Sequence, residues 1–147
     1  MTKRRRLIEF FEGYEANFNA AILCVADGVT QCADAFAEVF VAAEPARLAC
    51  SRNDDSFRQS IEESCLFYRT VGTRAVRLDG IDSTPIDGDH VMARVHWRGE
   101  FRRADGSDVE VPFDIVYFVR MNDDVMKIFG YVTGDQQAAL RQHGVLN

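Results

Sequence analysis

Residues 90–119, HVMARVHWRGEFRRADGSDVEVPFDIVYFV, decide the fold class of this chain. In the first third of this stretch apolar residues occupy every second position, alternating with Met92, Arg94, His96 and Arg98. This period of two is typical of a β-strand with one buried face. Asp105-Gly106 is a hairpin signal, and the alternation continues after it on the odd positions Val109, Val111, Phe113, Ile115, Tyr117 and Val119. We therefore predict a hairpin of two long antiparallel strands.

Two further segments extend this hairpin into a sheet. Residues 74–82 have the pattern of a strand, with Gly80 as the site of a bulge. Residues 125–132 have the pattern of a last strand. The prediction is an antiparallel meander of four strands, two of them about a dozen residues long against about five or six in an average strand. Strands of that length in a small domain must curve.

The N-terminal half of the chain has the period of an α-helix instead. Apolar side chains recur three or four residues apart over residues 7–21, at Leu7, Phe10, Phe11, Tyr14, Phe18 and Ala21. The spacing predicts a second helix over residues 30–39 with Cys32, Phe36 and Val39 on its apolar side, then short strands at 40–42 and 47–50. A third helix is predicted from Ser56 to about Gly72, with Phe57, Ile61, Cys65 and Tyr68 in line.

The order of these elements predicts the fold class. Helices come first and antiparallel strands follow, which indicates an α+β fold. A short terminal helix capped by Asp135 and ending at Gly144 completes it. We expect one domain, residues 1–147, in which a curved antiparallel sheet forms a cone over three N-terminal helices.

Composition excludes several classes of partner. The net charge is −6 and the pI about 5.0, which argues against nucleic acid, and no apolar run is long enough for a membrane helix. Acidic residues interrupt the stretch after Lys3–Arg6, so it is not read as a signal peptide. The four cysteines form no CxxC pair or zinc spacing, so we expect buried thiols, a cytoplasmic protein, and no metal or cofactor.

The element order, together with Tyr-x-Ala-x-Phe-Asn-Ala at residues 14–20, resembles the nuclear transport factor two-like superfamily over almost the whole chain. The resemblance implies a cystatin-like α+β roll. This superfamily includes ketosteroid isomerases, SnoaL-like cyclases, scytalone dehydratase, limonene epoxide hydrolase and members without a known reaction. Fold alone does not choose among these functions.

Three short motifs resemble the ketosteroid isomerases more closely. Tyr14 stands five residues before Asn19, Glu44 precedes Pro45 nine residues after Phe36, and Pro112-Phe113-Asp114 matches the family's Pro-apolar-Asp strand. The resemblance implies that Tyr14 and a protonated Asp114 form an oxyanion hole, with Glu44 as the general base. Glu44 departs from the family, which has an aspartate there, and residues 19–36 form a longer segment than in typical isomerases.

On this hypothesis the protein binds a small hydrophobic carbonyl compound and isomerises it or cleaves it as a lyase, without a cofactor. The cavity would be lined by Phe18, Phe36, Val116 and Phe118. The alternative is a non-catalytic dimeric module of the same fold, which binds an apolar ligand or supports assembly. The two hypotheses differ in whether Tyr14, Glu44 and Asp114 converge on one enclosed cavity.

The even positions of residues 90–98 remain open to two other interpretations. By resemblance, Arg94 or Arg98 with Asp114 could position a water as in limonene epoxide hydrolase, or His90 and His96 could act as in scytalone dehydratase. The simpler interpretation is that this face is solvated or faces a partner. Since superfamily members commonly dimerise through the open sheet face, the resemblance implies a homodimer.

Overall fold

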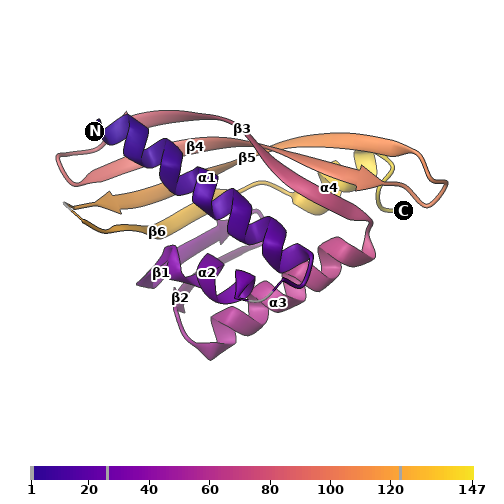
Figure 1. The fold of residues 1–147 in the computed structure, drawn as a ribbon, viewed down its shortest axis with the longest axis horizontal. Coiled ribbons are helices and arrows are strands. Elements are labelled where there is room, and N and C mark those ends of the chain that lie inside the picture. Colours follow the sequence, from indigo (N-terminus) through magenta and orange to yellow (C-terminus); the bar gives the residue numbers. More distant parts are fainter. Residues whose placement is uncertain (1, 26, 123) are drawn as a thin grey trace.

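The alternation in residues 90–119 forms two long antiparallel strands, β4 (His90–Arg102) and β5 (Asp108–Met121), in the structure, a computed structural model that describes residues 2–25, 27–122 and 124–147. Strands β3 (Thr73–Pro85) and β6 (Met126–Thr133) flank them as predicted. The register of β3 on β4 shifts between Leu78 and Gly80, which confirms the predicted bulge. The four-strand meander is therefore present and forms most of a curled sheet (Figure 1).

The sheet is larger than the sequence predicted. Strands β1 (Phe36–Glu44) and β2 (Arg47–Arg52) join it, and the strand order is β2-β1-β6-β5-β4-β3. Strand β1 pairs parallel with β6, so the prediction of a wholly antiparallel sheet is wrong at this one pair. The α+β class and the cone over N-terminal helices are confirmed.

The second helix ends earlier than predicted. Helix α2 (Gly28–Asp34) has seven residues, and Phe36, predicted to be helical, is the first residue of β1. Phe36 and Phe40 are four residues apart, and that spacing places two side chains on one face of a strand as well as of a helix. The backbone of Ile128 donates to the carbonyl of Ala35 at 2.8 Å, which draws the chain into the sheet immediately after α2.

The other helices match the predicted segments. Helix α1 (Lys3–Ile22) crosses one face of the sheet obliquely, and α2 and α3 (Asp55–Thr70) lie beside its C-terminal half (Figure 1). The carboxylates of Asp54 and Asp135 accept from backbone N–H groups one turn into α3 and α4 (Gln136–Gln142), at 3.1 and 2.9 Å. The Asp135 cap was predicted from the sequence.

Helix α1 also covers the free edge of strand β3. The Asn19 amide donates to the carbonyl of Val76 at 2.9 Å and accepts from its N–H at 2.8 Å, and Glu15 Oε2 accepts from the N–H of Leu78 at 2.5 Å. Further along, Arg4 donates to the carbonyl of Ile81. These bonds satisfy backbone groups that an edge strand would otherwise leave open to another chain.

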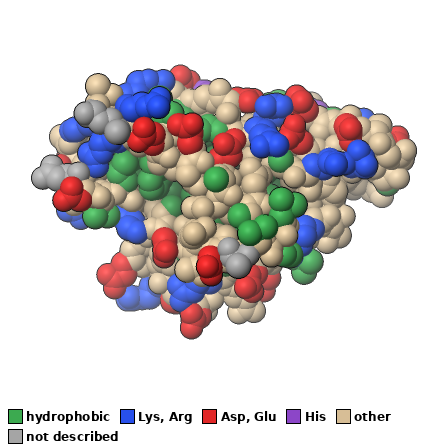
Figure 2. Space-filling view, viewed as in Figure 1, with side chains coloured by type: hydrophobic (Ala, Val, Ile, Leu, Met, Phe, Trp, Pro, Cys, Tyr) green, Lys and Arg blue, Asp and Glu red, His purple; other side chains and the backbone are tan. Residues whose placement is uncertain are grey.

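A second group of contacts fixes the start of α1. Lys and Arg side chains gather there at the upper left of the molecule (Figure 2). Lys3 and Arg6 donate to the carbonyls of Gly88 and Asn122 in the loops after β3 and β5. At the other end, Gly28 begins α2 against α1, where a Cβ would lie 2.5 Å from the backbone nitrogen of Ala21. The two ends hold α1 across the sheet.

The core lies between α1 and the sheet, and Leu7, Phe11, Val95, Val119 and Ile128 are among its fully buried members. The cysteine prediction is half correct: all four thiols are free, Cys32 and Cys65 are buried, and Cys24 and Cys50 are exposed. Among the residues that the structure describes, none of the helices combines the length and apolar character needed to cross a membrane.

Candidate functional site

The inner face of the sheet, helices α1 and α3, the β1–β2 turn and α4 line a half-open cavity of about 860 Å³. Its walls are dominated by aromatic side chains. They include all four tyrosines of the chain, its single tryptophan and six phenylalanines: Tyr14, Tyr68, Tyr117, Tyr131, Trp97, Phe18, Phe36, Phe40, Phe57, Phe67 and Phe113. The predicted lining residues Phe18 and Phe36 are both present.

Tyr14 lies at the centre of the aromatic wall. Its ring centroid is 6.2 Å from those of Phe36 and Trp97 and 6.3 Å from those of Phe18 and Tyr117. Within the described part of the chain its hydroxyl has no hydrogen-bond partner. Burial, reinforced by the neighbouring Tyr117, raises the pKa of Tyr14 well above its usual value. Tyr14 therefore offers a neutral phenol whose O–H is free to donate.

The other buried phenols are also held neutral, and two of them are occupied by protein partners. The Tyr68 hydroxyl donates to Gln136 Oε1 at 2.9 Å, and the Tyr117 oxygen accepts from Trp97 Nε1 at 3.3 Å. Burial raises the pKa of Tyr68 to about 12 and that of Tyr117 further still. Tyr14 thus differs from Tyr68 in having no protein acceptor.

Glu44 lines the same cavity, at its mouth. It is the last residue of β1, faces Arg47 across a two-residue turn, and is exposed. Burial raises the pKa of Tyr131; the Glu44 carboxylate raises it further, and the Arg47 guanidinium partly offsets this. Tyr131 pairs with Ala42, two positions before Glu44 on the same face of β1, so the carboxylate lies at the Tyr131 side of the mouth and is open to water.

Asp114 does not lie in the cavity, and its predicted place beside Tyr14 is wrong. Side chains alternate between the two faces of a strand. In β5 the odd positions Phe113, Ile115 and Tyr117 face the cavity, so Asp114 projects from the outer face. Val116 and Phe118 share its parity, and the prediction that they line the cavity is wrong for the same reason.

On the outer face, Asp114 belongs to a polar cluster across three strands. His96 Nδ1 lies 2.8 Å from Asp114 Oδ1 and His96 Nε2 lies 2.8 Å from Asp82 Oδ2, while Arg94 Nη1 is 3.8 Å from Asp114 Oδ2. Hydrogen bonding to Asp82 and then to Asp114 raises the pKa of His96. The simpler interpretation of the even positions is confirmed: Arg94 and His96 face away from the cavity, so neither can position a water there.

Sequence reasoning missed Tyr68, Tyr117, Tyr131 and Trp97 as site residues. Each lies in a segment predicted to be a helix or a strand, and a signal was available. The chain has only four tyrosines, and at least three of them fall on the apolar positions of their helix or strand. Polar phenols repeated at core positions indicate a cavity as well as they indicate a core, because a buried hydroxyl needs a partner.

The described residues hold no group of three or more His, Cys, Asp and Glu placed to bind a metal ion. No protein-family model matches the sequence, and no curated protein matches it either. Solved structures do resemble it. An NTF2-like protein with a cystatin-like fold from Novosphingobium aromaticivorans is 17% identical, with a TM-score of 0.63, over 98% of this chain and 93% of that one.

The chain has the nuclear transport factor two-like fold. Two other structures of this group are similar to it. A ketosteroid isomerase-like protein from Erwinia carotovora atroseptica has 14% identity and a TM-score of 0.57 over 91% of this chain and 97% of that one. A candidate scytalone dehydratase from N. aromaticivorans has 13% identity and a TM-score of 0.65 over 88% and 81%. At these identities the likeness establishes the fold alone.

Proposed function

We propose that this NTF2-like domain binds a small apolar molecule that carries a hydrogen-bond-accepting oxygen. The observation that carries the proposal is the Tyr14 hydroxyl, which has no partner among the described residues and lies in a cavity lined with aromatic rings. The cavity volume of about 860 Å³ lies within the range of about 300–1,000 Å³ found for small-molecule sites. A neutral phenol in such surroundings favours a ligand oxygen that accepts a hydrogen bond from it while the phenol keeps its proton.

The experiment compares 2-acetylnaphthalene with 2-isopropylnaphthalene, in which a methyl group replaces the carbonyl oxygen. The single indole N–H signal of Trp97 in a ¹H–¹⁵N spectrum reports on the cavity, since no other tryptophan exists in the chain. We expect both compounds to shift this signal and Tyr14→Phe to weaken ketone binding about two- to ten-fold, the value of one hydrogen bond.

The control variant is Asp114→Asn, which lies on the outer face and should leave both affinities unchanged. An unmoved Trp97 signal with either compound would contradict the proposal. Equal ketone affinity in wild type and Tyr14→Phe would contradict the role of the hydroxyl.

Proton transfer is a second candidate function, favoured by one observation. Glu44 and Tyr14 line the same cavity, so a carboxylate base and a phenolic acid are both available to one ligand. The isomerase hypothesis is therefore limited to Glu44 and Tyr14 and does not include Asp114. Conversion of a β,γ-unsaturated ketone to its conjugated isomer, followed by ultraviolet absorbance, tests it. Glu44→Gln should abolish turnover and retain ketone binding, and turnover that persists in this variant would exclude Glu44 as the base.

A homodimer through the outer face of the sheet fits the apolar residues found there. Residues that pair across neighbouring strands form one row over five strands. The exposed Leu48 begins a second row beside it. The first row is Cys50, Val41, Gly130, Phe118 and Met92. An apolar row of this kind, beside the polar cluster of His96, is typical of a surface that meets a partner.

The oligomeric state tests the homodimer. We expect light scattering on a sizing column to give twice the chain mass of 16.6 kDa, and Phe118→Lys to give a folded monomer. Glu12→Lys, an exposed position on α1, is the control and should leave the dimer intact. A wild-type protein that elutes as a monomer at all concentrations would contradict the homodimer.

A further inference from the structure

The charged side chains at the cavity are strongly biased toward one sign. Among the described residues, four carboxylates line it against one guanidinium: Glu15, Glu44, Glu63 and Asp135 against Arg47. Glu15 is committed to the backbone of β3, and Asp135 caps α4. Glu44 and Glu63 are exposed at the mouth and form no ion pair in the described part of the chain. Two carboxylates are therefore free to meet a ligand.

The aromatic walls behind this mouth also attract cations. The faces of tyrosine, tryptophan and phenylalanine rings carry negative potential and attract cations, with tryptophan the strongest. Tyr131 brings the two features together, because its ring lies 6.2 Å from that of Phe36 in the wall and it pairs with Ala42, two positions before Glu44 on the same face of β1. Carboxylates around an opening of low polarity also concentrate cations from solution.

We propose that the ligand of this cavity is an organic cation, an ammonium group attached to an apolar body. This inference rests on the proposed small-molecule function and adds the charge of the ligand to it. The apolar body fills the space beside Trp97, and its oxygen accepts from Tyr14. The ammonium group lies toward the mouth, between the Tyr131 ring and the carboxylates of Glu44 and Glu63. Among the described lining residues, an anion would find one cationic side chain, Arg47, outnumbered by carboxylates.

The test compares benzyltrimethylammonium with neopentylbenzene, its uncharged carbon analogue of nearly the same shape, and follows the Trp97 indole signal. We expect the cation to bind about five- to ten-fold more tightly, since attraction to aromatic faces and to carboxylates acts on the charge alone. We also expect added salt to weaken the binding of the cation more than the binding of the hydrocarbon.

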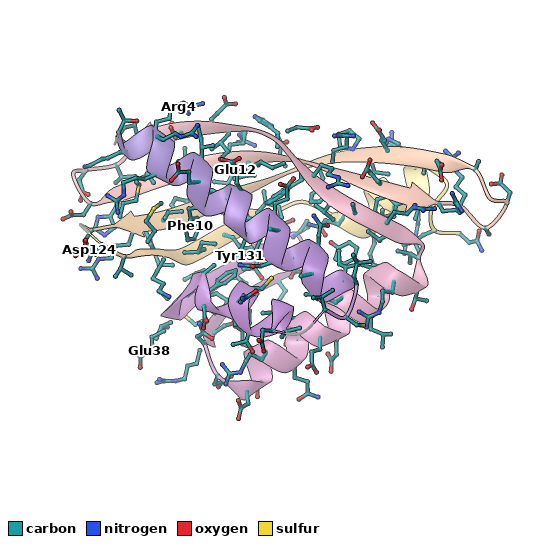
Figure 3. All side chains as sticks on the ribbon, viewed as in Figure 1. Arg4, Phe10, Glu12, Glu38, Asp124 and Tyr131 are labelled. Atoms are coloured by element: carbon teal, nitrogen blue, oxygen red, sulfur yellow. The ribbon has the colours of Figure 1, made fainter. Side chains whose placement is uncertain are left out.

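Two double variants with the same change in net charge separate the mouth from the rest of the surface. Glu44→Gln with Glu63→Gln should reduce cation affinity several-fold and leave neopentylbenzene binding unchanged. Glu12→Gln with Glu38→Gln is the matched control, because both positions are exposed and outside the cavity; Glu38 points away from the molecule in Figure 3. The control should bind both compounds as wild type does.

Three results would overturn the inference. Equal or tighter binding of neopentylbenzene would leave the small-molecule function standing and show that the cavity does not select a cation. An equal loss of cation affinity in both double variants would show that overall charge, and not the mouth, attracts the ligand. An unmoved Trp97 signal with both compounds, and with the naphthalene pair, would remove the proposed function as well.

Discussion

Around Trp97 and Tyr117, the two faces of the β4–β5 hairpin are built from neighbouring residues and have opposite chemistry. Trp97 and Tyr117 face inward, are buried, and share a hydrogen bond within the cavity wall. His96 and Asp114 lie within three positions of these residues and face outward. Their own hydrogen bond is exposed to solvent. The position of a residue in the alternation therefore decides whether it can touch a ligand, and the identity of the residue does not.

This comparison explains why a short motif misled the site prediction. Pro112-Phe113-Asp114 matches the isomerase motif letter by letter, but the strand that carries it turns Phe113 inward and Asp114 outward. A three-residue match contains no information on which face is buried. The surrounding ten residues do, because they alternate on the odd positions.

The largest loss of stability should come from truncating one side chain on the inner face. Trp97→Ala removes a buried ring from the cavity wall and should lower the free energy of unfolding by about 3–5 kcal/mol. His96→Ala, one residue away on the outer face, should lower it by no more than about 1 kcal/mol because its ion pairs are open to solvent. Urea unfolding of both variants measures the contrast, and equal losses would contradict the assignment of faces.

The inner phenols should make the fold sensitive to alkali. Burial raises the pKa of Tyr68 from 10.0 to about 12, so the folded state retains a proton that the unfolded state releases. The stabilisation is complete below pH 10 and is lost as the pH rises from 10 to 12, and Tyr68 alone accounts for about 2–3 kcal/mol. Phenolate absorbance should appear only on unfolding. Ionisation of the tyrosines near pH 10 in the folded protein would show that their hydroxyls are exposed to solvent.

Much of the fold could be predicted from sequence, and the reasons are local. The period of two in residues 91–119, the bulge at Gly80 and the cap at Asp135 depend on near neighbours and were predicted correctly. The parallel pairing of β1 with β6 joins segments about ninety residues apart, and no local pattern specifies it.

The candidate site was predicted less well than the fold. Tyr14, Glu44, Phe18 and Phe36 do line one cavity, which the resemblance implied. The resemblance failed at Asp114, and the tyrosines of α3, β5 and β6 were overlooked because a cavity is a gap between elements. Its existence depends on how far α3 stands from the sheet, which no single segment of sequence encodes.

An intermediate effect is expected where α1 covers the sheet edge. Asn19→Ala removes both hydrogen bonds to Val76 and leaves two partly buried backbone groups without a partner. The free energy of unfolding should fall by about 1–3 kcal/mol. Asn19→Asp is the comparison variant, since its carboxylate accepts from the N–H but cannot donate to the carbonyl. A loss below about 0.5 kcal/mol in Asn19→Ala would mean that water replaces the amide.

The smallest effect should arise on the outer face. The carboxylates of Asp82 and Asp114 raise the pKa of His96 above 6.5, so protonation of His96 favours the folded state. That contribution is complete below pH 6.5 and is lost as the pH rises through the folded-state pKa. NMR titration of the His96 ring should show a lower pKa in Asp82→Asn and in Asp114→Asn than in wild type. An unchanged value in both variants would contradict the cluster.

The location of a bound ligand tests the division between the two faces most directly. We predict that the crystal structure of the complex with 2-acetylnaphthalene places the rings in the cavity beside Trp97, with the carbonyl oxygen about 2.5–3.0 Å from the Tyr14 hydroxyl oxygen. A ligand seated on the outer face, against His96 and Asp114, would contradict the account.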